Sequence, residues 1–236
     1  MDAIEAGAGS KGERHAIVTG ASSGIGCAIA ERLLGAGWRV TGLDIAPATI
    51  EHPDFRGEIV DLTDSEATRT CLSVLDGVTA LVHAAGFMRT AALGEIDPSD
   101  GEAMWRLHVA AATLLANALA PRMAAGSRIL LIGSRTAAGA ASRSQYAATK
   151  AALAGLARSW AIELAPRQIT VNVIAPAATD TPMLRDPSRQ GVPPRTPPIG
   201  RFILPSEVAA LAAFLLSEEA GAITGQEIVI CGGASL

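Results

Sequence analysis

One tyrosine and one lysine form the pattern with the clearest chemical use in this chain. Tyr146 is the only tyrosine among the 236 residues, and Lys150 follows it four positions later. Residues four apart lie on the same face of a helix, so the ammonium can lie beside the phenol. A free tyrosine has a pKa of about 10, and a nearby positive charge lowers the pKa toward neutrality. The pair therefore predicts an acid–base group that exchanges a proton with a substrate hydroxyl.

The composition makes this pair unusual. The chain has one other lysine, Lys11 near the N-terminus. All the other residues in its lysine and arginine count are arginines. Lysine offers a compact charge with several donors, whereas arginine is bulkier and keeps its proton under ordinary conditions. The alternative is an ordinary surface pair on a helix, and an arginine-rich chain has little reason to use lysine for that purpose.

A glycine-rich turn near the N-terminus is the second pattern with chemical meaning. Residues 19–26 read TGASSGIG and lie between an apolar run and a helical segment. Glycines let the backbone approach a phosphate closely, and the following helix directs free N–H groups at the anion. Asp44 comes roughly 20 residues later, at the end of the next apolar run, where a carboxylate can bind ribose hydroxyls. The alternative role of Asp44 is to cap a turn.

These motifs, in this order, resemble the short-chain dehydrogenase/reductase family. TGxxxGIG is that family's cofactor motif and YxxxK its catalytic signature; HAAG at 83–86, PAATDT at 176–181 and ITGQ at 223–226 extend the resemblance over residues 14–236. It implies a bound nicotinamide dinucleotide. The implied cofactor residues are Gly20, Ser22, Ser23, Ile25, Gly26, Asp44, Asp61, Leu62, Ala84, Ala85, Gly86, Tyr146, Lys150, Ile174 and Thr181.

The cofactor is predicted to be NAD. Asp44 would repel the 2′-phosphate of NADP, and neither the TGASSGIG turn nor the residues directly after Asp44 supply an arginine or lysine to bind that phosphate.

The resemblance also implies a catalytic set. Ser134, at the end of an apolar run, matches the serine that hydrogen-bonds the reacting oxygen. Its interval to Tyr146 is one residue shorter than the family pattern, and Ser142 and Ser144 are the rival serines. His108 stands where the family has an asparagine that holds a water of the proton relay. His108 either supports such a relay or is a buried histidine bonded to a backbone carbonyl. His83, which replaces the first asparagine of the family's NNAG, is expected to be structural.

Short apolar runs alternate with helix-length segments, which is typical of parallel strands covered by helices. We expect a single doubly wound (Rossmann) α/β domain over 13–236, with a seven-stranded parallel sheet and helices on both faces. Residues 1–12 are expected to be a flexible leader. The proline-rich stretch 181–204 is expected to be a substrate lid, or else a surface connector. Expected strands are 15–19, 39–43, 58–60, 80–83, 128–132, 170–174 and 227–230; expected helices are 24–34, 65–75, 100–123, 145–164 and 205–216.

The substrate is less well defined by the sequence. AAGxxR at 84–89, TDTPM at 179–183 and the ending GGASL resemble dihydrodiol dehydrogenases, enzymes that act on a dihydroxy-dihydrobenzoate. We therefore hypothesise that Arg89 binds a substrate carboxylate, the alternative being a solvated surface arginine. The other substrate candidates are Arg135, Met183 and Leu184.

Composition excludes several other classes. The net charge is −4 with no run of basic residues, so a nucleic-acid partner is not expected. The longest apolar stretch is too short to cross a membrane. Three widely spaced cysteines without a CxxC predict no metal or disulfide framework and favour a reducing cytoplasm.

The sequence therefore predicts an NAD(H)-dependent oxidoreductase that interconverts a secondary alcohol, such as a cyclic diol or hydroxy acid, and its ketone. The family resemblance implies a homotetramer or homodimer. One alternative is a dinucleotide-binding regulatory or scaffold protein that has lost turnover. Another is an epimerase or dehydratase of sugar nucleotides, against which the glycine spacing counts.

Overall fold

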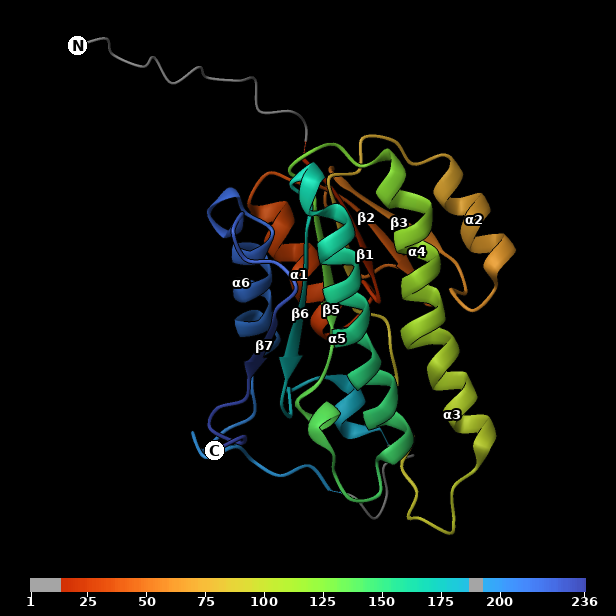
Figure 1. The fold of residues 1–236 in the computed structure, drawn as a ribbon, viewed down its shortest axis with the longest axis vertical. Coiled ribbons are helices and arrows are strands. Elements are labelled where there is room, and N and C mark those ends of the chain that lie inside the picture. The colour runs from red at the N-terminus through yellow and green to blue at the C-terminus, as the bar shows by residue number, and fades with distance from the viewer. Residues whose placement is uncertain (1–13, 187–192) are drawn as a thin grey trace, which may run out of the picture.

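A seven-stranded parallel sheet forms the centre of the molecule (Figure 1). The computed structural model describes residues 14–186 and 193–236. The strand order is β3-β2-β1-β4-β5-β6-β7, and every pairing is parallel. The strands are β1 (His15–Thr19), β2 (Arg39–Asp44), β3 (Phe55–Ile59), β4 (Ala80–His83), β5 (Arg128–Ile132), β6 (Thr170–Pro176) and β7 (Glu227–Ile230). The expected doubly wound α/β fold is confirmed.

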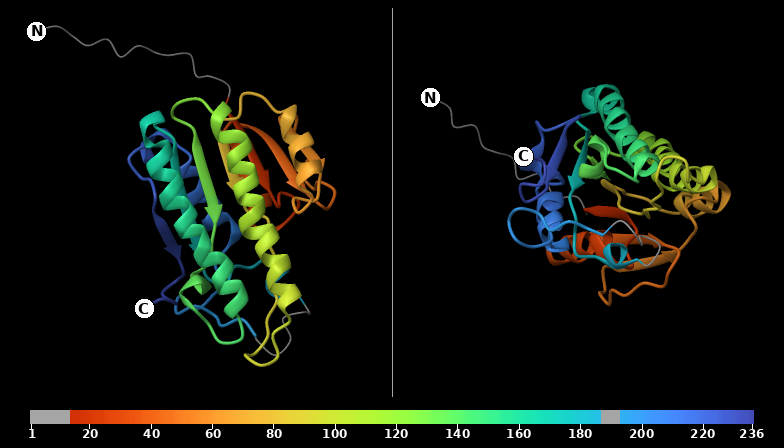
Figure 2. Two further views of the ribbon diagram at one scale, coloured as in Figure 1. Left: turned by 45° about the vertical axis from the view of Figure 1, so that its right-hand side comes forward. Right: turned by 90° about the horizontal axis from the view of Figure 1, so that it is seen from below.

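Helices cover both faces of the sheet (Figure 2). α1 and α6 pack on one face, while α2, α4 and α5 pack on the other. The helices are α1 (Gly24–Gly35), α2 (Ser65–Ser73), α3 (Pro98–Trp105), α4 (Ala111–Leu119), α5 (Ser144–Leu164) and α6 (Pro205–Leu215). No helix in the described part of the chain is both long enough and apolar enough to pass through a bilayer.

The two cores follow from the alternation of side chains along each strand. On β1, Ile17 points into the core with α2, α4 and α5, while Ala16 and Val18 point into the core with α1 and α6. Because β1, β4, β5 and β6 are buried along their whole length, they appear in the sequence as continuous apolar runs. This arrangement places all the carboxyl ends of the strands at one edge of the sheet.

Two elements differ from the expected ones. β3 begins at Phe55, three residues before the expected start, because this edge strand is mostly exposed and its residues Phe55–Ile59 have no apolar run. The helix expected over 100–123 is interrupted by a π-helical turn, η1 (Arg106–Ala110), which separates α3 from α4. The other expected strands and helices lie within two residues of the observed ones.

The expected leader at 1–12 lies outside the described residues. The expected lid at 181–204 is described on both sides of 187–192. It begins with the short turn η5 (Pro182–Arg185), and Pro193, Pro194, Arg195, Thr196 and Pro198 line the large cavity described below.

Candidate active site

A cavity of about 1280 Å³ opens at the carboxyl ends of the strands. Its walls come from the loops after β1 to β6 and from the start of α5. The strand order reverses between β1 and β4, because the chain builds β2 and β3 on one side of β1 before crossing to β4. Ligands of open α/β sheets bind outside the carboxyl ends at such a switch point.

The glycine turn approaches its neighbours so closely that side chains have no room. A Cβ on Gly26 would lie 2.2 Å from the carbonyl oxygen of Gly20. Gly20 itself has φ +68°, and its Cβ would lie 3.0 Å from the backbone of Ala85. Ser23 is the N-cap residue of α1, but its side chain accepts no hydrogen bond from the N–H groups of the first turn. The N-cap residue of α2, Asp64, accepts two such bonds. The first turn of α1 therefore presents N–H groups to the cavity, as a pyrophosphate requires.

Asp44 connects the end of β2 to this turn. Its carboxylate accepts hydrogen bonds from the N–H groups of Ser22 and Ala46, both at 3.0 Å. Asp44 also lines the cavity, and Asp61 and Leu62 line the same end. Asp44 therefore caps the turn and also faces the cavity.

Thr19 joins the glycine turn to the loop after β4. Its hydroxyl oxygen accepts the N–H groups of Ala84 and Ala85, each at 3.0 Å. The Thr19 hydroxyl donates to Nδ1 of His83 at 3.0 Å, and Nε2 of His83 donates to the carbonyl of Leu107, also at 3.0 Å. Burial lowers the pKa of His83 to about 3, so the ring is neutral. His83 is thus a structural link, as the sequence predicts.

Tyr146 and Lys150 lie on the first turns of α5, and both line the cavity. Each side chain is only 5% exposed, and Lys150 Nζ lies 5.8 Å from the centre of the Tyr146 ring. Lys150 donates to the carbonyl of Ile132 at 2.9 Å. Burial lowers the pKa of Lys150 from 10.5 to about 8, which still leaves the ammonium charged at neutral pH. The structure therefore brings the two residues together.

Ser134 follows β5 and faces the same cavity. Its Oγ accepts the N–H of Thr136 at 3.1 Å, which fixes the side chain and leaves the hydroxyl proton available to a ligand oxygen. Of the rival serines, Ser142 lines the cavity with a positive φ of 59°, and Ser144 is the first residue of α5.

His108 lies in the middle of the π turn η1 and is fully buried. Its Nε2 accepts the N–H of Phe87 at 3.2 Å, and its Nδ1 lies 2.8 Å from the Thr149 hydroxyl. The ring meets Tyr146 edge-on, with 5.7 Å between ring centres. Burial, and then the charge of Lys150, hold the pKa of His108 well below its usual 6.5. His108 contacts α5 but does not line the cavity.

The remaining predicted residues divide into two groups. Ser23, Ile25, Ala84, Ala85, Gly86, Arg135, Thr181, Met183 and Leu184 line the cavity. Ser22, Ile174 and Arg89 do not. The N–H of Ser22 bonds Asp44, and the carbonyl of Ile174 accepts the N–H of Gly133 at 2.7 Å.

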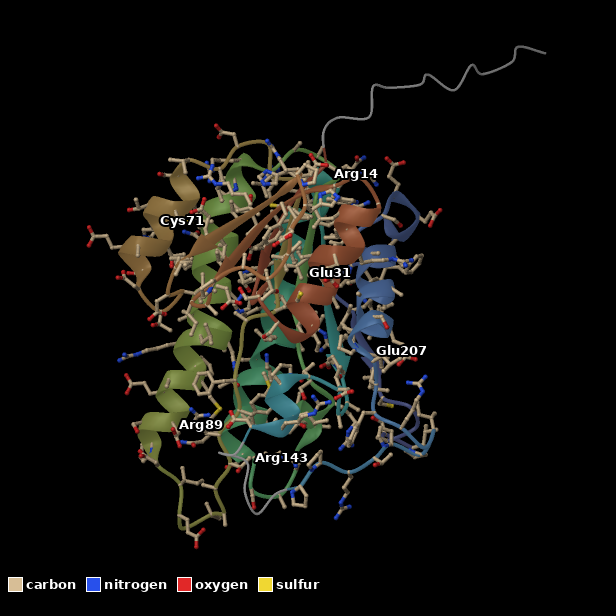
Figure 3. All side chains as sticks on the ribbon, turned by 180° about the vertical axis from the view of Figure 1, so that it is seen from behind. Arg14, Glu31, Cys71, Arg89, Arg143 and Glu207 are labelled. Carbon is tan, nitrogen blue, oxygen red and sulfur yellow. The ribbon has the colours of Figure 1, made fainter. Side chains whose placement is uncertain are left out.

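Arg89 is held away from the cavity by acidic and aromatic neighbours. It lies 3.8 Å from both Asp100 and Asp186, with its guanidinium 5.0 Å from the centre of the Phe87 ring. Arg143, which is not among the residues predicted from the sequence, lines the cavity directly before α5. Figure 3 shows Arg89 beside α3 and Arg143 at the start of α5, at the same end of the molecule. Sequence offers one signal for Arg143: it precedes Tyr146 by three residues, which is the spacing of one helical turn.

Comparison with known proteins identifies the family. A family model described as enoyl-(acyl carrier protein) reductase matches residues 20–235. This chain is a short-chain dehydrogenase/reductase. It is 34% identical to 2,3-dihydro-2,3-dihydroxybenzoate dehydrogenase of Escherichia coli, over 93% of this chain and 96% of that protein. It is 35% identical to a 3-oxoacyl-[acyl-carrier-protein] reductase of Salmonella typhimurium, over 92% and 96% of the two chains.

A solved structure of similar fold is consistent with this assignment. The blue fluorescent protein from a metagenomic library, determined in complex with NADPH, has a TM-score of 0.83 and 28% identity. The match covers 94% of this chain and 98% of that one. The short-chain dehydrogenase/reductase fold and its use of a nicotinamide dinucleotide therefore apply to this chain, and the glycine turn and uncapped α1 fit that group.

Proposed function

We propose that this short-chain dehydrogenase/reductase is an NAD(H)-dependent enzyme that interconverts a secondary alcohol and its ketone. The observation that carries the proposal is the burial of Tyr146 and Lys150 side by side, at the wall of the cavity that contains the glycine turn. Bound nicotinamide would supply the hydride acceptor or donor.

The residues of the chain would handle the proton and the substrate oxygen. In the oxidative direction, the Tyr146 phenolate takes the hydroxyl proton at its Oη. The Lys150 ammonium stabilises this phenolate and lowers the pKa of the phenol. The Ser134 hydroxyl donates a hydrogen bond to the reacting oxygen and stabilises its charge.

NAD is favoured over NADP by the end of the cavity that contains Asp44. A carboxylate there accepts hydrogen bonds from ribose hydroxyls and repels a 2′-phosphate. Among the described lining residues next to Asp44, none is an arginine or a lysine. The blue fluorescent protein was solved with NADPH, so the proposed preference of this chain for NAD rests on the carboxylate of Asp44.

An acidic group on the substrate is favoured by the opposite end of the cavity. Arg135, Arg143 and Arg195 line this end, and none of the described lining residues there is aspartate or glutamate. Met88, Met183 and Leu184 add apolar surface. Together they favour a cyclic or short-chain hydroxy acid whose carboxylate faces the arginines. The relative from E. coli acts, by its name, on a dihydroxybenzoate derivative.

The single tyrosine makes the proposed proton transfer directly testable. Ultraviolet difference absorbance follows tyrosine ionisation, and Tyr146→Phe identifies the signal because no other tyrosine exists. We expect a phenol pKa below the value of about 10 for a free tyrosine in the NAD-bound protein, and a rise of that pKa in Lys150→Ala. A normal pKa in the NAD-bound protein would refute the mechanism.

A panel of secondary alcohols, with and without carboxylates, tests the reaction itself. We expect NAD reduction with at least one alcohol of the panel and none with Tyr146→Phe. Tight NAD binding without oxidation of any alcohol would favour the alternative, a dinucleotide-binding regulatory protein.

Cytoplasmic location stays a prediction from cysteine usage, and Cys27, Cys71 and Cys231 are all free thiols in the structure.

We propose self-association at the edge of the sheet formed by β7, with α5 on one face of the sheet and α6 on the other. Ile162, Phe214 and Val229 expose 78%, 42% and 47% of their surfaces there, and β7 is an edge strand with an unpaired side. A homodimer or homotetramer would bury these side chains. Sedimentation equilibrium tests this, because Ile162→Asp should shift the protein toward the monomer if the surface is an interface.

A further inference from the structure

The two ring nitrogens of His108 have opposite, fixed roles. A backbone N–H can only donate, so Nε2, which lies 3.2 Å from the N–H of Phe87, must be the acceptor and carry no proton. The single proton of the neutral ring is then on Nδ1, which faces the Thr149 hydroxyl at 2.8 Å. Burial together with the charge of Lys150 keeps the ring neutral.

Thr149 continues this chain of hydrogen bonds to the tyrosine. Its hydroxyl accepts from His108 Nδ1 and donates to the carbonyl of Tyr146 at 2.9 Å. Thr149 is 2% exposed, so water does not compete for these bonds. The donors therefore run in one direction, from Phe87 through His108 and Thr149 to Tyr146. This bridge joins the cofactor loop after β4 to the first turn of α5.

We propose that His108 and Thr149 are positioning residues that hold Tyr146 against the loop after β4, and that the imidazole of His108 keeps its single proton on Nδ1 and gains no second proton during turnover. The inference rests on the proposed function, since it concerns the placement of the proposed acid–base group. Every ring nitrogen and hydroxyl in the bridge already has a partner, which makes the bridge a rigid link.

Proton uptake by His108 would break this link. A proton on Nε2 would displace the Phe87 N–H and would add a second positive charge beside Lys150. The ring packs closely on the backbone of Gly86, since a Cβ at that position would lie 2.9 Å from His108 Nε2 and 3.5 Å from Lys150 Nζ. The other titratable groups that face the ring are the neutral His83 from β4 and the Tyr146 phenol from α5.

The first test needs no turnover, so it remains informative if the proposed reaction is wrong. Nitrogen-15 NMR of histidine-labelled protein reports which ring nitrogen carries the proton, and His108→Gln assigns the signal by its loss. We expect His108 to stay neutral with its proton on Nδ1 from pH 6 to pH 9, with and without NAD. A proton on Nε2, or a titration of His108 within this range, would overturn the proposal.

The second test measures the contribution of the bridge to catalysis. Thr149→Val keeps the shape of the side chain but removes the hydroxyl, and we expect kcat to fall about tenfold while KM stays unchanged. Thr149→Ser restores the hydroxyl and should keep kcat near the wild-type value. Neither variant should lose an ionisation from the pH–rate profile. A kcat for Thr149→Val within twofold of wild type, or a Thr149→Ser as slow as Thr149→Val, would refute a positioning role.

Discussion

The two ends of the cavity differ in charge and in burial. The end beyond β2 and β3 carries Asp44 and Asp61, on loops that are partly or fully exposed. The end beyond β5 and at the start of α5 carries Lys150, Arg135 and Arg143, with Lys150 fully enclosed. The two sets lie on opposite sides of the switch between β1 and β4.

This difference suggests that the acidic end selects the ligand, while the buried cationic end changes the acidity of Tyr146. Charges at the exposed acidic end are screened by water and can discriminate between ligands only by modest free energies. The buried ammonium acts in a medium of lower polarity, where its effect on a neighbouring phenol is stronger, and where its burial costs stability. The glycine turn lines the same cavity as both charged sets.

The largest expected effect comes from breaking the turn between the two ends. Gly26→Ala would place a Cβ 2.2 Å from the Gly20 carbonyl, so the main chain of the turn must move. We expect the Kd for NAD to rise about 100-fold, because the N–H groups of α1 would lose their alignment.

Gly35→Ala provides the matched control in the same helix. A Cβ on Gly35, the last residue of α1, meets nothing within 4 Å, so this variant should bind NAD normally and gain about 0.5 kcal/mol of stability. Isothermal titration calorimetry measures both Kd values. A Gly26→Ala protein that binds NAD within threefold of wild type would show that the turn does not hold the pyrophosphate.

The second prediction concerns the stability cost of the buried ammonium. Burial lowers the pKa of Lys150 from 10.5 to about 8, so below pH 8 the folded protein carries a charge that the unfolded chain holds more favourably. Lys150→Met should therefore be more stable than wild type at pH 7 by about 2 kcal/mol, after allowing for the lost hydrogen bond to Ile132.

This advantage should shrink as the pH rises from 8 to 10.5. Over that range folded wild type releases the proton while the unfolded chain keeps it, so wild-type stability rises with pH. Urea unfolding of the cofactor-free proteins at several pH values tests this, with Lys150→Arg as the variant that keeps the charge. A Lys150→Met advantage that is absent at pH 7, or that does not change with pH, would contradict the prediction.

The third substitution removes a charge from the acidic end of the cavity. Asp44→Asn removes the negative charge, and we expect the preference for NAD over NADP to fall about tenfold, mainly through tighter NADP binding. Asp54→Asn is the control, because Asp54 does not line the cavity. Competition binding with both cofactors gives the ratio, and an unchanged ratio in Asp44→Asn would remove Asp44 as the determinant of preference.

The smallest expected effect tests the cationic end. Arg143→Met should raise KM for an acidic substrate about fivefold and leave KM for a neutral alcohol unchanged. Arg89→Met is the matched control, since Arg89 lies between Asp100 and Asp186 and outside the cavity wall. Steady-state kinetics with both kinds of substrate decide between them: a larger effect of Arg89→Met would restore the original hypothesis and refute the assignment to Arg143.

The sequence predicts the parts of this molecule in which local pattern and burial agree. Buried parallel strands are apolar along their length, and the spacing of Tyr146 and Lys150 requires only that the segment be a helix. The π turn has no such signal, because residues 106–110 contain no proline or glycine and continue an apolar helical pattern. The placement of Arg89 depends on Asp100 and Asp186, which are distant in sequence, so composition and spacing cannot reveal it.

The π turn η1 also fixes the rotation of α3 relative to α4 about the shared helix axis. A π turn contains one residue more than an α-helical turn, and one residue corresponds to about 100° of helix rotation. Deleting a single residue from 106–110 would restore an unbroken helix, but it would rotate Met104 out of its buried contact with Met88 and Tyr146. The extra residue thus sets the angular register between α3, whose Met104 packs with Met88 and Tyr146, and α4, which packs on the sheet. Insertions or deletions at this place are consequently expected to be far more harmful than substitutions.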